Sequence, residues 1–199
     1  LPIPGSSAIA PIPEHIETPA DTVSLPLPIT ESSNETTPIC LVEFPAGEAT
    51  AQQRLAAFTR GDTPPIYQDA ALRDRPDLDG TSRLSPYLRF GLISARQAVL
   101  AAYQAMQVAP GSEARRGAEV WLNELIWREF YLHILDHFPR VRRQNFRLEG
   151  IAWRNDEAEF ATWKQGLTGY PFLDAAIRLV VSTGWMHNRP RMVVASFLT

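Results

Sequence analysis

The sequence has almost no cysteine, a single lysine and no long uninterrupted run of apolar residues. Its one cysteine, Cys40, cannot form an internal disulfide or supply a cysteine-rich zinc site. No segment approaches the roughly 18 consecutive apolar residues that a membrane span requires. The first residues, Leu-Pro-Ile-Pro-Gly, lack the basic start of a signal peptide and are interrupted by proline. We therefore expect a soluble protein of a reducing compartment, the cytoplasm.

Positive charge is missing from the first quarter of the chain. Residues 1–50 contain seven acids and neither Lys nor Arg, whereas residues 51–199 carry a net charge of +4. Of the 19 basic residues only Lys164 is a lysine. Arginine binds phosphates through a planar fork and stacks on flat rings, so this bias points weakly to phosphate or nucleotide ligands. A high genomic GC content would produce the same bias.

Composition divides the chain near residue 45. Residues 1–45 hold nine of the 17 prolines and no aromatic residue before Phe44. Such a segment cannot bury enough apolar surface to offset its chain entropy, which predicts an extended linker. Residues 46–199 show no sustained two-residue alternation, which predicts an all-α domain. The chain begins on Leu and stops within the apolar run 191–199, so we expect a piece truncated at both ends.

Helix start and stop signals recur from residue 46 onward. Capping boxes are predicted at Thr50–Gln53 and Ser94–Gln97, the second opening a helix that ends near Met106. The other predicted helices are residues 113–138, ended by Pro139; residues 155–164, capped by Asn155; residues 171–184, begun by Pro171; and a last helix begun by Pro190.

One face of the predicted helix 113–138 gathers rings and charges. At 100° per residue, an arc of about 120° holds Trp121, Glu124, Trp127, Arg128 and Tyr131. One interpretation is a packing face on which Glu124 and Arg128 form an i,i+4 ion pair. The other is the wall of a cavity whose rings stack on flat ligands such as bases. The helix taken by itself favours the packing face.

Two further segments have open interpretations. The hydroxyls of Thr81, Ser82 and Ser85 precede a turn begun by proline, where they could hold a phosphate or only cap a loop. The segment 183–192 sets Arg189 and Arg191 beside an amide and an indole, which suits an anion and a ring. A lone tryptophan in such a segment is more often part of a core.

One spacing resembles a metal site. Glu129, His133 and His137 are spaced i, i+4 and i+8 on the same predicted helix. The order does not match a His-Glu-x-x-His helix, and nothing else in the sequence completes a coordination shell. We therefore predict that no metal is bound.

Three sequence segments together resemble the DNA photolyase and cryptochrome family, and most closely its bacterial class I members that repair cyclobutane pyrimidine dimers. They are Gly80–Gly91 (GTSRLSPYLRFG), Trp121–Phe130 (WLNELIWREF), and the segment 168–198 with its TGYP and TGWMHNR motifs. The resemblance implies an α/β antenna domain, a connector and a helical domain that binds FAD. This chain would then be the interdomain linker, 1–45, and part of the helical FAD-binding domain, 46–199, without the antenna domain or the C-terminal part.

The resemblance also implies the site residues. Those near FAD are Tyr67, Thr81, Ser82, Arg83, Leu84, Ser85, Trp121, Arg128, Asn188 and Arg191. The catalytic set is Glu124, Trp127, Asn188 and Met192, with Trp127 stacking on the lesion and Glu124 hydrogen-bonding it. DNA would contact Arg73, Glu124, Trp127, Arg128, Tyr131, Asn188 and Arg189. Trp153 matches the surface end of an electron-transfer relay.

One position departs from the family pattern. The tyrosine expected twelve residues before Thr81 is replaced by Asp69, and Tyr67 lies two residues away. Either the loop shifts so that Tyr67 contacts FAD, or that contact is lost. Because the chain also lacks the later flavin-site residues of the family, we expect weak or no FAD retention and no repair by this piece alone.

The activity implied is repair of UV-damaged DNA. An electron passes from light-excited reduced FAD to a flipped-out dimer, the ring splits, and the electron returns. The protein would be a monomer, bound to the nucleoid when it engages DNA, with no membrane or metal partner and no antenna chromophore on this segment. The alternatives are a cryptochrome-type blue-light receptor and a DNA-binding relic whose flavin site has decayed.

Overall fold

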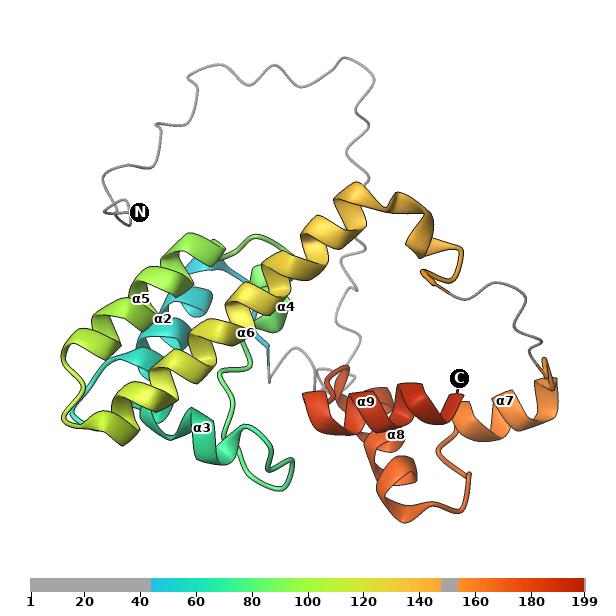
Figure 1. The fold of residues 1–199 in the computed structure, drawn as a ribbon. Helices are drawn as coiled ribbons and strands as arrows, with labels where there is room; N and C mark the ends of the chain where they lie inside the picture. The colour runs from blue at the N-terminus through green and yellow to red at the C-terminus, as the bar shows by residue number, and fades with distance from the viewer. Residues whose placement is uncertain (1–43, 148–153, 199) are drawn as a thin grey trace, which may run out of the picture.

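The computed structural model describes residues 44–147 and 154–198, and within these ranges the regular elements are helices without strands (Figure 1). This confirms the all-α prediction. The predicted linker lies outside the described residues except for Phe44 and Pro45, and so does Trp153. Among the described helices, none has the length and apolar character needed to cross a membrane.

A first group of helices surrounds the larger core. Helices α2 (Glu48–Thr59), α5 (Ala95–Gln107) and the first half of α6 (Ser112–His137) pack side by side (Figure 1). The short elements η2 (Pro65–Gln68), α3 (Asp69–Leu72) and α4 (Ser85–Arg89) complete this group. Its buried side chains include Leu55, Phe58, Ile66, Leu84, Tyr87, Trp121 and Leu125. The second half of α6 extends beyond this core, to the turn η3 (Pro139–Arg142).

The elements α7 (Glu157–Lys164), α8 (Pro171–Thr183) and α9 (Asn188–Leu198) form the second group. Helices α8 and α9 pack together over a smaller core of Leu173, Ala176, Ile177, Met186 and Val194. The Asp174 carboxylate accepts hydrogen bonds from the amide and hydroxyl of Thr168 and the amide of Gly169. The hydrogen bond from the Thr168 hydroxyl is the main cause that lowers the pKa of Asp174. These bonds fix the turn that leads into α8.

The predicted boundaries hold closely for several helices. Ser94 caps α5 with both arms of the capping box, its hydroxyl accepting from the Gln97 amide. Helix α6 ends at His137, immediately before Phe138 and Pro139. Helix α8 begins at Pro171 and ends at a left-handed glycine, Gly184. The last helix begins at Asn188, two residues before Pro190.

Two predicted caps are wrong. Thr50 lies inside α2, which begins at Glu48, and its hydroxyl donates back to the Ala46 carbonyl at 3.5 Å. Asn155 precedes α7 in a left-handed conformation, and the cap is Asp156, whose carboxylate accepts from the amides of Ala158 and Glu159. A carboxylate is as good a cap as an amide and adds a favourable charge at the helix start, so the neighbouring residue can take the role.

Helix α6 passes very close to the η2 turn at Gly117. A Cβ placed on Gly117 would lie 2.3 Å from the Tyr67 carbonyl oxygen and 2.6 Å from that of Ile66. Both neighbours are backbone atoms, so the turn would have to move. The absence of a side chain at this position therefore lets α6 hold η2, and with it the start of α3, in place.

Substituting Gly117 tests this contact. In an open helix, Gly→Ala gains about 1 kcal/mol of stability. At Gly117 the clash should reverse the sign, and we expect Gly117→Ala to lower the unfolding free energy by about 2 kcal/mol. Gly111→Ala is the matched control, because its Cβ meets nothing within 4 Å; it should change stability by no more than about 0.5 kcal/mol. Urea unfolding of the protein expressed from its complete gene measures both, and equal effects would contradict the contact.

Candidate functional site

Four charged side chains from three segments of the chain form a continuous chain of ion pairs. Arg73 Nη1, just after α3, lies 2.5 Å from Glu124 Oε1 on α6. Arg73 Nε lies 3.6 Å from Asp74 Oδ1, and the same oxygen lies 2.7 Å from Arg189 Nε on α9. The order Glu124–Arg73–Asp74–Arg189 therefore links the two helix groups. We call these four residues the ion-pair chain.

The i,i+4 ion pair considered for Glu124 and Arg128 does not form. Arg128 Nη1 instead lies 2.5 Å from Glu129 Oε1, and its Nη2 donates to the Leu88 carbonyl at 3.4 Å. Glu124 is taken by Arg73 because α3 packs directly against α6. The helix pattern could not show this partner, which comes from another element.

The loop at residues 81–85 contacts both helix groups. The Trp121 indole N–H donates to Ser82 Oγ at 3.3 Å. The Arg83 guanidinium lies 4.6 Å from the centre of the Trp185 ring, and its Nε lies 2.9 Å from Asp79 Oδ1. Arg83 has a φ of +51°, a left-handed conformation that non-glycine residues adopt at some cost. The loop is thus held in one defined conformation.

The members of this loop face different ways. Leu84 is only 1% exposed and belongs to the larger core, so its side chain is structural. Thr81 and Ser82 are half-buried, and Ser85 is exposed at the start of α4. Trp121 packs on Phe58 with ring centres 5.3 Å apart, which makes it both a core residue and a neighbour of the loop.

Helix α6 presents an exposed group of rings next to Glu124. Trp127 is 53% exposed and Tyr131 is 64% exposed. With Phe130 they form a mutually packed trio, in which the Trp127 ring centre lies 5.5 Å from that of Phe130 and 6.2 Å from that of Tyr131. Large rings that remain this open on a helix offer flat surface to a ligand or another part of the protein.

The first turn of α9 brings the remaining predicted residues together. Asn188 Nδ2 and Arg189 Nη1 lie 3.9 and 3.8 Å from Met192 Sδ. The Arg191 guanidinium donates to the Met186 carbonyl at 2.8 Å, which directs it back toward the preceding turn. Asn188 and Met192 therefore lie beside the end of the ion-pair chain.

Some predicted residues are not part of this arrangement. The Tyr67 hydroxyl donates to the Ala105 carbonyl on α5 at 3.1 Å, which commits it to packing between helices. Trp153 lies outside the described residues. His133 and His137 have ring centres 6.1 Å apart, and Glu129 is paired with Arg128. Within residues 44–147 and 154–198, no group of three or more potential ligands could hold a metal ion.

Three titratable residues of this region were not among the predicted site residues. Asp74 is the central acid of the ion-pair chain, and the hydrogen bond from Arg189 lowers its pKa. His187 is buried, accepts the Arg189 amide hydrogen on Nδ1 at 3.2 Å, and has its pKa lowered mainly by burial. Asp69 is buried at the start of α3, and burial raises its pKa to about 7. Only the departure from the family pattern at Asp69 gave a signal in the sequence.

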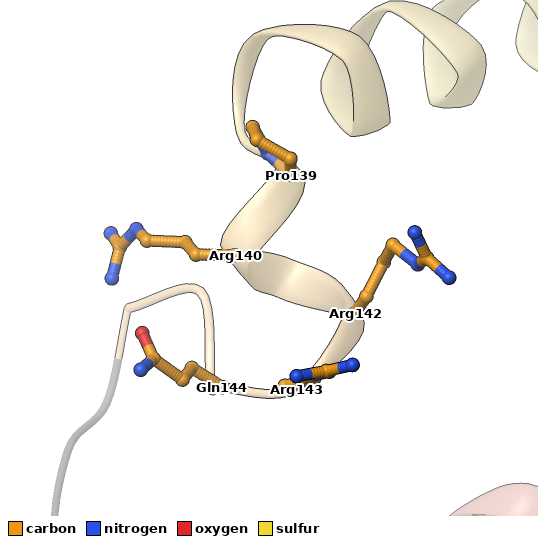
Figure 2. Close-up of a pocket in the computed structure, with 5 residues that line it drawn as sticks. All are labelled: Pro139, Arg140, Arg142, Arg143 and Gln144. Atoms are coloured by element: carbon orange, nitrogen blue, oxygen red, sulfur yellow. The ribbon is translucent and has the colours of Figure 1, made fainter.

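A separate surface hollow lies at the turn after α6, lined by Pro139, Arg140, Arg142, Arg143 and Gln144 (Figure 2). Figure 2 shows Arg140 and Arg142 pointing to opposite sides of the turn. Guanidinium groups that diverge do not form a shared binding site for one anion. None of the predicted site residues lies here.

Comparison with known proteins relates this chain to one family. Residues 121–199 match the family described as FAD binding domain of DNA photolyase. A deoxyribodipyrimidine photo-lyase of Vibrio cholerae is 46% identical over 153 residues, which are 75% of this chain and 31% of that protein. The chain thus spans about a third of the length of this relative.

Solved structures agree with this relation. The class III photolyase of Agrobacterium tumefaciens superimposes with a TM-score of 0.68 and 36% identity, over 76% of this chain and 30% of that one. The cryptochrome of Synechocystis sp. PCC6803 has a TM-score of 0.71 and 27% identity, over 82% and 34%.

The raised pKa of Asp69 makes a prediction about stability. Between an unfolded pKa near 3.8 and a folded pKa of about 7, the folded state keeps a proton that the unfolded state has lost. Stability should therefore fall as pH rises through this window and level off above it. Asp69→Asn has no charge to gain at this position, so it should not lose this stability as pH rises. The unfolding free energy of the variant minus that of the unsubstituted protein should therefore increase by on the order of 4 kcal/mol from pH 4 to pH 8. Urea unfolding across this range measures the difference, and a pH-independent difference would contradict it.

Proposed function

The chain belongs to the DNA photolyase family, and from this membership we propose that the protein containing it uses light to repair cyclobutane pyrimidine dimers in DNA. The observation that carries the proposal is the ion-pair chain. It joins Glu124, predicted to face the lesion, directly to Arg73 and through Asp74 to Arg189, both predicted to hold DNA phosphates. The exposed Trp127 lies one turn further along the same helix.

The donor set of the 81–85 loop fits the phosphates and rings of FAD. Thr81, Ser82 and Ser85 supply hydroxyl donors, Arg83 supplies a cation, and Trp121 and Trp185 supply rings that contact the loop. We propose that these groups hold the cofactor, together with Arg128, Asn188 and Arg191. The chemistry that FAD supplies when bound in its reduced form is donation of one electron on excitation by light. No antenna chromophore site is proposed on this segment.

On this proposal the lesion leaves the DNA stack to reach the site, because a stacked dimer is inaccessible and a damaged base costs less to unstack. Trp127 offers the ring on which the extruded bases stack, and Tyr131 extends that surface. Glu124 accepts a hydrogen bond from the base edge, while Asn188 and Met192, which contact each other on α9, approach the lesion from that helix. Each role uses a side chain that is already near the ion-pair chain.

On this proposal, binding of DNA changes the partners in the ion-pair chain. Arg73 and Arg189 are held by Glu124 and Asp74 in this structure. If they bind phosphates, those carboxylates lose their cations, and Glu124 becomes available to the lesion. An arginine–phosphate bond is similar in kind to the arginine–carboxylate bond that it replaces, so the exchange does not require a large net cost in free energy.

A cryptochrome-type light receptor is the second candidate, favoured by the similarity to the Synechocystis cryptochrome. The two functions share the helical domain and differ in whether dimers in DNA are repaired. Loss of dimers from a defined oligonucleotide under blue light, with a dark control, separates them in the protein expressed from its complete gene. Light-dependent loss supports repair, bound and photoreducible FAD without loss supports the receptor, and neither flavin nor loss indicates a relic.

Truncation of Trp127 tests its stacking role. We expect Trp127→Ala to weaken binding of dimer-containing DNA by roughly 1–3 kcal/mol, because one base–aromatic stack is lost. Phe90→Ala is the matched control, since Phe90 is an exposed ring immediately after α4 and outside the proposed site. Fluorescence anisotropy in the dark gives both affinities. Unchanged affinity in a folded Trp127→Ala protein would remove Trp127 from the lesion site.

A further inference from the structure

Asp69 is a buried acid that lies close enough to the ion-pair chain for Arg73, Asp74 and Glu124 to act on its charge. It is the first residue of α3 and is only 3% exposed. Its Oδ2 atom is buried and has no hydrogen-bond partner among the described residues. A buried carboxyl oxygen without a partner is costly when charged, so the surroundings favour the protonated form of this side chain.

The charged groups that act on Asp69 come from each neighbouring segment. Arg73 lies one helical turn later on the same element, and its amide donates to the Asp69 carbonyl at 2.9 Å. Asp74 follows it in the chain, and Glu124 on α6 raises the pKa of Asp69 through its charge. Arg73 is therefore shared among three acids: it is bonded to Glu124, close to Asp74 and adjacent to Asp69.

The charge balance depends on Asp69. The ion-pair chain has two acids, Glu124 and Asp74, and two bases, Arg73 and Arg189, so it is neutral by itself. With Asp69 protonated, the cluster stays neutral. With Asp69 ionised, the cluster has one excess negative charge, and that charge lies next to the two arginines proposed to hold DNA.

We propose that Asp69 is a positioning residue that sets the affinity of this site for damaged DNA through its own charge. When neutral, it leaves Arg73 free to exchange its carboxylate partners for phosphate. When ionised, it holds Arg73 more strongly and repels the phosphate backbone. The inference rests on the proposed function.

The direction of the pH effect follows. Burial is the main cause that raises the pKa of Asp69, and Glu124 and Asp74 add to it while Arg73 opposes it. The charge therefore changes near neutral pH. The affinity for DNA should decrease as pH rises from 6 to 8.5.

The test is the dissociation constant of a duplex carrying one thymine dimer, measured by anisotropy in the dark at fixed ionic strength from pH 6 to 8.5. In the unsubstituted protein, expressed from its complete gene, we expect it to rise roughly three- to tenfold. In Asp69→Asn it should stay near the low-pH value throughout. Asp77→Asn is the control: it removes the same charge from an exposed acid paired with Arg75 and should keep the full pH dependence.

A pH dependence that persists unchanged in Asp69→Asn would overturn the inference. If that variant does not fold, the infrared band of a protonated carboxyl in the unsubstituted protein decides. If this band disappears over the pH range in which the affinity for DNA falls, the proposal is supported. If the band is absent at pH 6, the proposal is contradicted. The proposed function fails separately, if no form of the protein prefers the dimer duplex over undamaged DNA.

Discussion

The arrangement of this site depends on the bond between Arg73 and Glu124. It joins the end of α3 to the middle of α6, and through Asp74 it reaches Arg189 on α9. Together with Arg83 on the Trp185 ring, this chain of charges connects the two helix groups, each of which has its own apolar core. Apolar packing forms each group, and these charged side chains lie where the predicted site residues of α6 and α9 come together.

Such a junction suits a site that must bind a polyanion. Partly exposed ion pairs contribute little to stability, about 0–1 kcal/mol each, so they can change partners at low cost. Each helix group has its own fixed point. Gly117 lets α6 hold the η2 turn in the first group, and Asp174 fixes the turn before α8 in the second. The structure thus combines fixed helices with exchangeable charges.

Much of the fold could be predicted from the sequence because its signals are local. Ser94 with Gln97, Pro139 and Gly184 each act within one helical turn, and the structure places them as predicted. Thr50 and Asn155 show the limit of such local signals. Helix α2 begins at Glu48, before Thr50, and Asp156 caps α7 in place of Asn155.

The partners within the site could not be predicted in this way. Glu124 has a candidate partner on its own helix, and its actual partner, Arg73, lies 51 residues away. The burial of Asp69 likewise depends on how α3 meets α6. The roles of the individual residues toward FAD and DNA stay predictions.

The most direct test of this account is a crystal structure of the protein, expressed from its complete gene, with a duplex that contains a pyrimidine dimer. The account predicts that Arg73 and Arg189 bind phosphates, that both arginines separate from Glu124 and Asp74, and that Glu124 contacts the extruded lesion. The contradicting result is a complex in which the bonds of 2.5 Å between Arg73 and Glu124 and 2.7 Å between Arg189 and Asp74 persist while other residues hold the DNA.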